Sequence, residues 1–250
     1  MKTPIVASAF ALMSTAALAQ DTIPESLGRV APALQAYTTD DLYGRVWQGD
    51  ELSARDRALV TFAALMTRHE TEALSAHIAL ALDAGVTAAE ISETITHLAF
   101  YSGWGNAMAA AEAAAPVFDA RGVEVADLPA VDVELLPLNE QAEDMREQMV
   151  RGNFGEVSIG VVDNTRDLLF RDLWLRPGLA PRDRSLVTVA ALVAAGQPDQ
   201  MSFHLARAMD NGLTQEEASG VLSHLAFYTG WPKVFSALPI AKQVFEQRAE

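Results

Sequence analysis

The sequence predicts an all-α protein made of two tandem helical modules. Three observations predict this fold class: helix-forming Ala, Leu, Met and Glu dominate, Gly and Pro lie between periodic segments, and one long stretch occurs twice. The chain has 250 residues, of which 50% are hydrophobic. It is therefore long enough to bury a core of its own and too apolar for a disordered or low-complexity protein.

Residues 1–19 are predicted to be a signal peptide. Lys2 supplies a short positive region, an apolar run follows from Ile5 to Ala17, and Ala17-Leu18-Ala19 matches the small-x-small pattern before a signal-peptidase cleavage site. The apolar run is too short to span a bilayer, although a buried N-terminal helix is an alternative. We expect cleavage after Ala19, export to a bacterial periplasm, and no membrane association after cleavage.

The rest of the chain consists of two copies of one sequence unit. A shift of 127 residues aligns residues 42–118 with the second half without a gap, and about 32 of 77 positions are identical. The matches include Arg55-Asp56-Arg57 with Arg182-Asp183-Arg184 and His97-Leu98-Ala99-Phe100-Tyr101 with His224-Leu225-Ala226-Phe227-Tyr228. We place the first module at 27–120 and the second at 140–247. The intervening 121–139 contains two prolines and lacks helical periodicity, so it is predicted to be a linker.

Helix boundaries are best marked in the last part of each copy. The spacing predicts a helix over about 54–68, then a helix that contains His77 and ends at Gly85, a residue suited to a left-handed C-terminal turn. Thr87 and Glu90 have the spacing of a capping box at the start of the next helix. Gly212, Thr214 and Glu217 repeat these signals in the second copy. A final helix is expected after Trp104 and again after Trp231.

Composition excludes several classes of function. The chain has no cysteine, so disulfide scaffolds, thiolate metal sites and cysteine nucleophiles are impossible. It has 33 acidic and 18 basic residues, for a formal charge of -15. Such a surface is unsuited to nucleic acid, whose phosphates require cations, and its main effect is solubility.

Four of the five histidines form two repeat-related pairs, His77 with His97 and His204 with His224. Each lies in an apolar helical stretch, where a hydrogen-bonded core histidine is the alternative to a functional one. Retention in both copies favours a functional role for His77 and His204, and leaves both interpretations open for His97 and His224. Histidine is the side chain best suited to proton transfer near neutral pH.

The histidines are not expected to bind a metal. Within a copy they are 20 residues apart on different helices, and no carboxylate accompanies them at a metal-ligand spacing. We predict neither a metal nor another cofactor. Arg57 and Arg184 begin apolar helices, where they either pack and cap or hold an anionic substrate through its carboxylate.

The second copy carries a family resemblance. It contains Trp174-Leu175-Arg176-Pro177-Gly178-Leu179, Arg184-Ser185-Leu186-Val187-Thr188, Gln200-Met201-Ser202-Phe203-His204 and His224-Leu225-Ala226-Phe227-Tyr228-Thr229-Gly230-Trp231-Pro232. This string resembles the carboxymuconolactone decarboxylase family, and specifically its gamma-carboxymuconolactone decarboxylase branch. The first copy resembles the family more loosely. The resemblance implies an alkyl-hydroperoxidase-D-like helical fold in each module and, for a chain with two modules, a homotrimer that forms a pseudo-hexamer of modules.

Family members that act as thiol peroxidases carry a Cys-x-x-Cys before the shared histidine and a glutamate earlier in the chain. None of these groups is present in either copy. The corresponding positions hold Glu70, Ala73 and Ala58 in the first copy and Gln197, Gln200 and Ser185 in the second. Peroxide reduction requires a thiolate, so that activity is excluded.

The decarboxylase branch needs no thiol and no cofactor. By resemblance, His204 is the candidate general acid/base with His224 in support, and Arg184 and Arg176 are candidate binders of an anionic substrate. His77, His97 and Arg57 are the corresponding candidates in the first copy. We expect a lyase that acts on a small carboxylated lactone or related organic acid. Family decarboxylases of this branch act in the cytoplasm, whereas the leader predicts export, so a periplasmic binding or scaffold protein that kept the fold without the chemistry is the alternative.

Overall fold

The computed structural model describes residues 22–249, and the predicted signal peptide lies outside the described residues. These residues are helical, with no strand among them, and they divide into two compact units separated after Gly49. The boundary falls inside the predicted first module, 27–120, so the residues of that module belong to both units.

The first unit, described from residue 22 to 49, consists of short helices. They are α2 (Leu27–Val30), α3 (Pro32–Ala36), the π-helix η2 (Tyr37–Tyr43) and the 3-10 turn η3 (Val46–Gln48). Its buried side chains are Tyr43 and Trp47, whose ring centroids are 5.9 Å apart.

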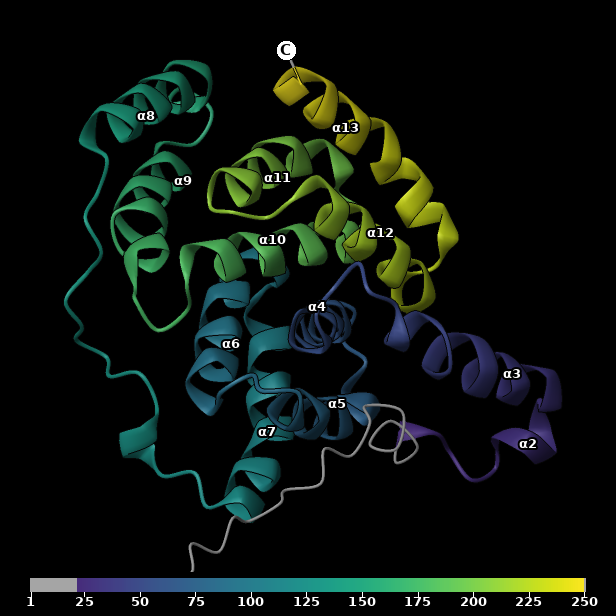
Figure 1. The fold of residues 1–250 in the computed structure, drawn as a ribbon. Helices are drawn as coiled ribbons and strands as arrows, with labels where there is room; N and C mark the ends of the chain where they lie inside the picture. The colour runs from purple at the N-terminus through teal and green to yellow at the C-terminus, as the bar shows by residue number, and fades with distance from the viewer. Residues whose placement is uncertain (1–21, 250) are drawn as a thin grey trace, which may run out of the picture. The chain divides into compact units, whose positions relative to one another are not determined.

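The second unit contains the two copies of a four-helix set (Figure 1). The first set is α4 (Ala54–Thr67), α5 (Thr71–Asp83), α6 (Ala88–Ser102) and α7 (Trp104–Arg121). The second is α10 (Pro181–Ala195), α11 (Met201–Asp210), α12 (Gln215–Thr229) and α13 (Trp231–Ala249). The predicted helices over 54–68 and after both tryptophans are confirmed.

The predicted stop and start signals are present in both copies. Gly85 and Gly212 have φ angles of 95° and 102°, a backbone conformation that side chains with a Cβ rarely adopt. The next helix begins with a complete capping box, in which Thr87 accepts a hydrogen bond from the backbone of Glu90 and Glu90 accepts one from the backbone of Thr87. Thr214 and Glu217 form the same box at α12.

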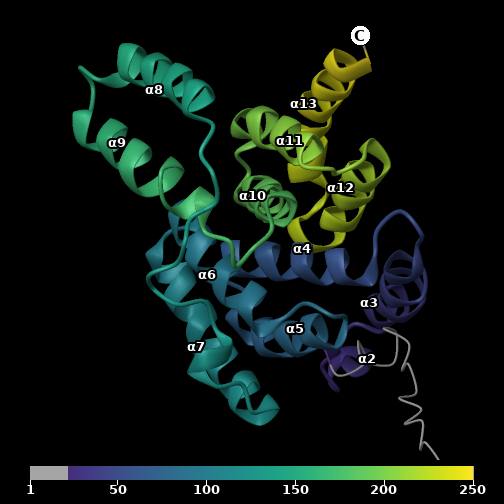
Figure 2. The ribbon, with the colours of Figure 1, turned by 60° about the vertical axis from the view of Figure 1, so that its left-hand side comes forward.

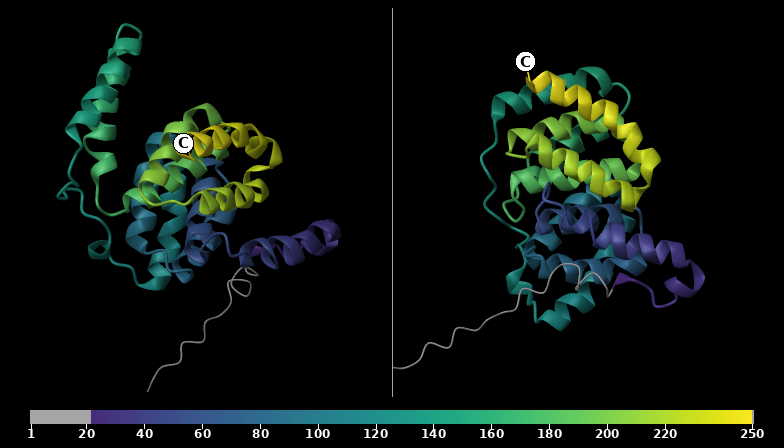
Figure 3. Two further views of the ribbon diagram at one scale, coloured as in Figure 1. Left: turned by 45° about the horizontal axis from the view of Figure 1, so that its top comes forward. Right: turned by 45° about the vertical axis from the view of Figure 1, so that its right-hand side comes forward.

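Between the two sets lie the connecting residues and a helical hairpin. Only the 3-10 turn η4 (Val125–Asp127) interrupts the extended residues after α7. The hairpin pairs α8 (Glu140–Phe154) with α9 (Ile159–Asn164), which continues into η5 (Thr165–Phe170). Figure 2 shows α8 and α9 side by side, and Figure 3 shows this hairpin projecting from the helices of the second copy. The 3-10 turn η6 (Leu173–Leu175) then leads toward α10.

The core lies where the two copies meet. Helices α4 and α10 pack on each other, α6 packs on α10, and α12 packs on α4. Because neighbours surround both central helices, they are buried on nearly every face, over residues 56–66 of α4 and 183–194 of α10. An analysis of the sequence that expects one apolar face per helix therefore underestimates how much of α4 and α10 is buried.

Ion pairs related by the repeat join the two copies. Each arginine contacts an aspartate of the other copy and the capping-box glutamate of its own copy. The pairs are Arg55 with Asp183 (2.7 Å) and Glu90 (2.5 Å), and Arg182 with Asp56 (2.8 Å) and Glu217 (2.9 Å). Because each contact has a counterpart 127 residues away, the copies face each other with approximate twofold symmetry.

Candidate functional site

The histidines come together across the two copies rather than within one copy. His97 of α6 and His204 of α11 both contact the rings of Tyr101 and Trp174. His77 of α5 and His224 of α12 both contact the ring of Tyr228. This arrangement follows from the packing of α6 on α10 and of α12 on α4. The histidines that sequence analysis paired within a copy, His204 and His224 among them, belong to different clusters.

His204 is held in an aromatic cluster. Its ring stacks on Trp174 with centroids 5.5 Å apart and planes 11° apart, and it contacts Tyr101 and Phe203 edge to face at 5.3 and 5.2 Å. Trp174 in turn donates a hydrogen bond from Nε1 to the hydroxyl of Tyr101 at 2.9 Å. His204 is 9% exposed, and its buried Nδ1 has no hydrogen-bond partner among the described residues.

The tautomer of His97 follows from its neighbours. Thr188 donates its hydroxyl proton to the carbonyl of Arg184 at 2.8 Å, so its oxygen accepts from His97 Nε2, 2.7 Å away. His97 Nδ1 lies 3.3 Å from Nη1 of Arg184, which is only a donor, so Nδ1 is the acceptor. His97 is therefore a neutral, fully buried ring with a proton on Nε2. Burial and the cation of Arg184 hold its pKa well below the ordinary value.

The two arginines that were predicted to bind substrate in the second copy are engaged by protein groups. Arg184 is fully buried, and its Nη2 contacts Glu93 Oε2 at 3.0 Å and the carbonyl of Arg176 at 2.7 Å. Arg176 donates from Nε to Glu93 Oε1 at 2.8 Å and from its terminal nitrogens to the carbonyls of Ala130 and Val131. Both arginines therefore support the walls of the cluster and have little capacity left for a ligand.

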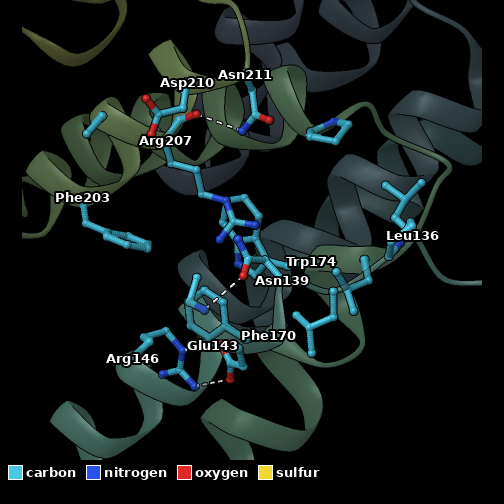
Figure 4. A pocket seen from close by; sticks show the side chains of 16 residues that line it. Leu136, Asn139, Glu143, Arg146, Phe170, Trp174, Phe203, Arg207, Asp210 and Asn211 are labelled. Carbon is cyan, nitrogen blue, oxygen red and sulfur yellow. Dashed lines mark hydrogen bonds and ion pairs between the residues drawn. The ribbon is translucent and has the colours of Figure 1, made fainter. Parts of the chain in front are cut away.

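A pocket of about 450 Å³ opens beside the His204 cluster. It lies between residues 136–146, the turn before α10, and α11, within the volume range of small-molecule sites. Its lining includes the aromatic side chains of Phe170, Trp174 and Phe203. In Figure 4, Arg207 extends from α11 toward Trp174, while Arg146 and Glu143 come from α8 on the other side.

Arg207 lines the pocket and forms no ion pair within residues 22–249, although Glu143 lies near enough to raise its pKa. Its guanidinium carbon lies 4.1 Å from the ring centroid of Trp174. The two acids that line the pocket are paired with other arginines, Glu143 with Arg146 at 2.6 Å and Asp210 with Arg248 at 2.7 Å. Burial lowers the pKa of Arg207, but a guanidinium stays protonated at neutral pH. A half-buried cation against an aromatic wall can bind a carboxylate.

The second cluster, formed by His77, His224 and Tyr228, repeats the histidine–threonine hydrogen bond of the first but has different neighbouring residues. His224 Nε2 lies 2.7 Å from the hydroxyl of Thr61, which donates to the carbonyl of Arg57, as in the relation of His97 to Thr188. Burial lowers the pKa of His77 to about 4. The pKa of His224 is lowered to about 3, first by burial, then by the cation of Arg57 and by repulsion from His77 when both rings are protonated. Position 80, the counterpart of Arg207, is Leu80.

The pKa of His204 is also lowered, to about 4, first by burial and then by the cation of Arg207. His204 is therefore neutral at pH 7 unless another charge approaches. Burial raises the pKa of Tyr101, so its phenol keeps its proton.

Within residues 22–249, no group of three or more His, Asp or Glu side chains is arranged to hold a metal ion, and no helix is long and apolar enough to cross a membrane.

Sequence reasoning missed Arg207, Glu93 and Tyr101. Tyr101 and Tyr228 are identical in the two copies, so the repeat alignment contains a signal for them. In that alignment Arg207 corresponds to Leu80, and Glu93 corresponds to Gly220. They are absent from one copy, so a search for residues shared by both copies cannot find them.

A family model described as the carboxymuconolactone decarboxylase family matches residues 32–116 and 161–243, more than half of the chain. Among curated proteins, the chain is 39% identical over 75 residues to 4-carboxymuconolactone decarboxylase of Acinetobacter baylyi, covering 30% of this chain and 56% of that protein. It is 27% identical over 78 residues to nitrosuccinic acid decarboxylase of Metarhizium robertsii, covering 31% and 54%. The chain thus matches just over half the length of each relative.

Among solved structures, the fold is similar to a crystal structure described as a gamma-carboxymuconolactone decarboxylase subunit of Burkholderia xenovorans LB400. The TM-score is 0.55 at 17% identity, and the alignment covers 96% of this chain and 98% of that one. At this identity the likeness shows a shared fold. The two family matches together with this likeness confirm the predicted tandem helical modules.

Proposed function

The chain belongs to the carboxymuconolactone decarboxylase family, and we propose that it is a cofactor-free carboxy-lyase acting on a small carboxylated lactone or related organic acid. One observation carries the proposal: the cation of Arg207 and the neutral ring of His204 contact the same side chain, Trp174, at the wall of a small-molecule pocket. Arg207 lines the pocket and can bind a carboxylate. His204, which can carry a proton, lies behind the pocket wall against Trp174 and Phe203.

Arg207 binds the substrate carboxylate in this proposal. Phe203, which is 50% exposed, offers an apolar ring to an unsaturated chain or a ring of the substrate. Arg146 lies over Phe170 with its guanidinium carbon 4.1 Å from the ring centroid. Arg146 is already paired with Glu143, so it orients a second polar group of the substrate rather than holding its main charge. These features fit a small anion with one apolar face.

Substrate binding changes the proton affinity of His204. In the free protein the cation of Arg207 contributes to the low pKa of this histidine. A bound carboxylate offsets that cation and adds a negative charge nearby, and both effects favour the imidazolium. His204 therefore takes up a proton from solvent as the anion binds, and it becomes an acid when an acid is needed.

The proposed decarboxylation accounts for every bond, electron pair and proton. The carbon–carbon bond to the carboxylate breaks, carbon dioxide leaves, and the electron pair remains on the substrate as an enolate-like anion. The imidazolium of His204 protonates this carbon and returns to its neutral form. The cation of Arg207 stabilises the negative charge that passes from the carboxylate to the substrate carbon.

The other predicted residues support this site or its counterpart. Arg184, Arg176 and His97 hold the walls in place. His77, His224 and Arg57 form the second cluster, in which Leu80 replaces the carboxylate-binding arginine, so we propose that this cluster contributes little turnover. No thiol is available for peroxidase chemistry.

A specific observation favours a second candidate, a binding or scaffold protein that kept the fold without the reaction. His204 is almost fully buried against three aromatic rings, an environment that also suits a histidine that only packs. In that case the pocket binds an organic acid and releases it unchanged.

We propose export to the periplasm on the basis of the leader, and assembly into a homotrimer on the basis of the family. Light scattering of the purified chain tests the assembly, for which we expect three times the mass of one chain. A monomer or a dimer would contradict it.

The function is tested by carbon dioxide release from a panel of carboxylated lactones and small dicarboxylic acids that includes 4-carboxymuconolactone and nitrosuccinic acid. The wild-type chain is compared with His204→Asn and with His69→Asn, a matched control at an exposed histidine. We expect turnover of at least one acid, its loss in His204→Asn, and no change in His69→Asn. Binding without turnover would support the second candidate, and equal rates in all three proteins would remove His204 from the mechanism.

A further inference from the structure

The two histidine clusters differ at one buried carboxylate. Glu93 lies on α6 beside the His97–His204 cluster, and its counterpart on α12 is Gly220. Glu93 is 1% exposed. A buried carboxylate is costly unless cations and hydrogen bonds compensate it, so its presence in only one of two related sites calls for a physical account.

Glu93 joins the first copy to the second. Its Oε2 lies 3.0 Å from Nη2 of Arg184, and its Oε1 lies 2.8 Å from Nε of Arg176. The close fit extends to Gly178, where a Cβ atom would lie 2.5 Å from Cγ of Glu93. The first copy thus supplies a carboxylate to two arginines of the second copy, and a glycine makes room for it.

Through Arg184 the carboxylate reaches the histidines. While Nη2 of Arg184 is held by Glu93, Nη1 of the same guanidinium points to Nδ1 of His97 at 3.3 Å. His97 contacts Trp174 edge to face at 5.0 Å, and Trp174 carries both His204 and Arg207 on its ring. Glu93 therefore fixes a series of contacts that ends at the two groups of the proposed chemistry.

The other cluster has the carboxylate in a different place. Glu51, the counterpart of Gly178, pairs with Arg57 at 3.7 Å, and its side chain is 60% exposed. A Cβ atom on Gly220 would lie 3.0 Å from Cβ of Glu51, so glycine and glutamate have exchanged sides between the clusters. The exchange turns a buried pair, with side chains 0% and 2% exposed, into a longer pair in which the arginine stays buried and the glutamate is open to solvent. An open pair is weaker and less well fixed.

We propose that Glu93 is a positioning residue that fixes Arg184 and His97 behind the Arg207–His204 pocket, so that the two histidine clusters are unequal and the site of the second copy is complete only with a carboxylate from the first. The functional part of this inference rests on the proposed carboxy-lyase activity, whereas the positioning part does not. It also makes the site of the second copy, which resembles the family more closely, dependent on a residue of the first.

The test compares Glu93→Gln with Glu51→Gln, the matched change at the other cluster. The first readout needs no substrate: imidazole nitrogen NMR shifts report which nitrogen of His97 carries the proton. The second is kcat and KM on any acid that the wild type decarboxylates. We expect Glu93→Gln to convert the single Nε2–H tautomer of His97 into a mixture and to lower kcat about 10-fold or more, with KM changed less because Arg207 is intact. Glu51→Gln should leave both readouts at wild-type values.

A third variant separates positioning from stability. Glu93→Leu combined with Arg184→Met replaces the buried pair by apolar side chains, an exchange that often restores stability. We expect its melting temperature to recover above that of Glu93→Gln while kcat and the His97 tautomer do not. Recovery of wild-type kcat in this variant, or an unchanged His97 tautomer in Glu93→Gln, would overturn the proposal. If no acid is turned over by the wild type, the proposed function fails, and the tautomer alone still decides whether Glu93 positions His97.

Discussion

Acid sensitivity is a direct consequence of the burial of His204. The folded protein holds the pKa of this histidine at about 4, whereas an unfolded chain has the ordinary value of about 6.5. Between these values the unfolded chain binds a proton that the folded chain does not, so stability is fully present above pH 6.5 and falls as the pH falls toward 4.

The magnitude follows from these two values. Lowering the pH from 7.5 to 5.5 should remove about 1.3 kcal/mol of stability through His204 alone, since each full pKa unit corresponds to about 1.4 kcal/mol. The variant His204→Asn lacks this titration, so its free energy of unfolding should change about 1.3 kcal/mol less over the same interval. Titratable groups that do not interact with His204 contribute equally to both proteins and cancel in the difference.

The assay is urea denaturation at both pH values, with His69→Asn as the control. His69 is exposed and has a φ of 59°, a conformation that asparagine tolerates, so this variant controls for a histidine-to-asparagine change away from the buried cluster. Equal losses in His204→Asn and in the wild type would refute the reasoning, because His204 would then have an ordinary pKa in the folded state.

Further predictions concern the frame of the site. Thr188→Val and Thr61→Val each remove the acceptor for a buried histidine Nε2–H, and each should cost about 1–3 kcal/mol in urea denaturation; a cost near zero would show that these hydrogen bonds are not formed. In a double-mutant cycle, Arg55→Ala with Asp183→Ala should give a coupling of about 1 kcal/mol across the two copies, and additive effects would contradict an ion pair at that interface. If the leader is cleaved as predicted, mass spectrometry of the exported protein should find a mature chain that begins at Gln20, and an intact leader would oppose export.

The fold could be predicted from the sequence because the residues that mark helix ends and starts act locally and occur in both copies. Gly85 with Thr87 and Glu90 marks a helix end and the next helix start, and Gly212 with Thr214 and Glu217 repeats the marks. These residues satisfy backbone groups within a few positions of themselves, so the structure adopts what the spacing predicts. Burial of α4 and α10 on nearly every face was not predictable, because it depends on contacts between the copies.

The site was predictable only in part, for the same physical reason. The histidines stand out because both copies keep them, but their partners are set by tertiary packing of α6 on α10 and α12 on α4. Arg184 looks like a substrate binder in the sequence, and only the structure shows Glu93, 91 residues earlier, at its guanidinium. Arg207, with Leu80 as its counterpart, carries no repeat signal, since the two copies have diverged at the pocket itself.

The central claim is that Arg207 and His204 act as one site, and proton uptake on ligand binding tests it most directly. Titration calorimetry of a carboxylate ligand at pH 6, in two buffers with different ionisation enthalpies, gives the number of protons taken up. The account predicts uptake of a measurable fraction of a proton per pocket in the wild type, none in His204→Asn, and greatly weakened binding in Arg207→Leu. Binding without proton uptake, or the same uptake in His204→Asn, would contradict it.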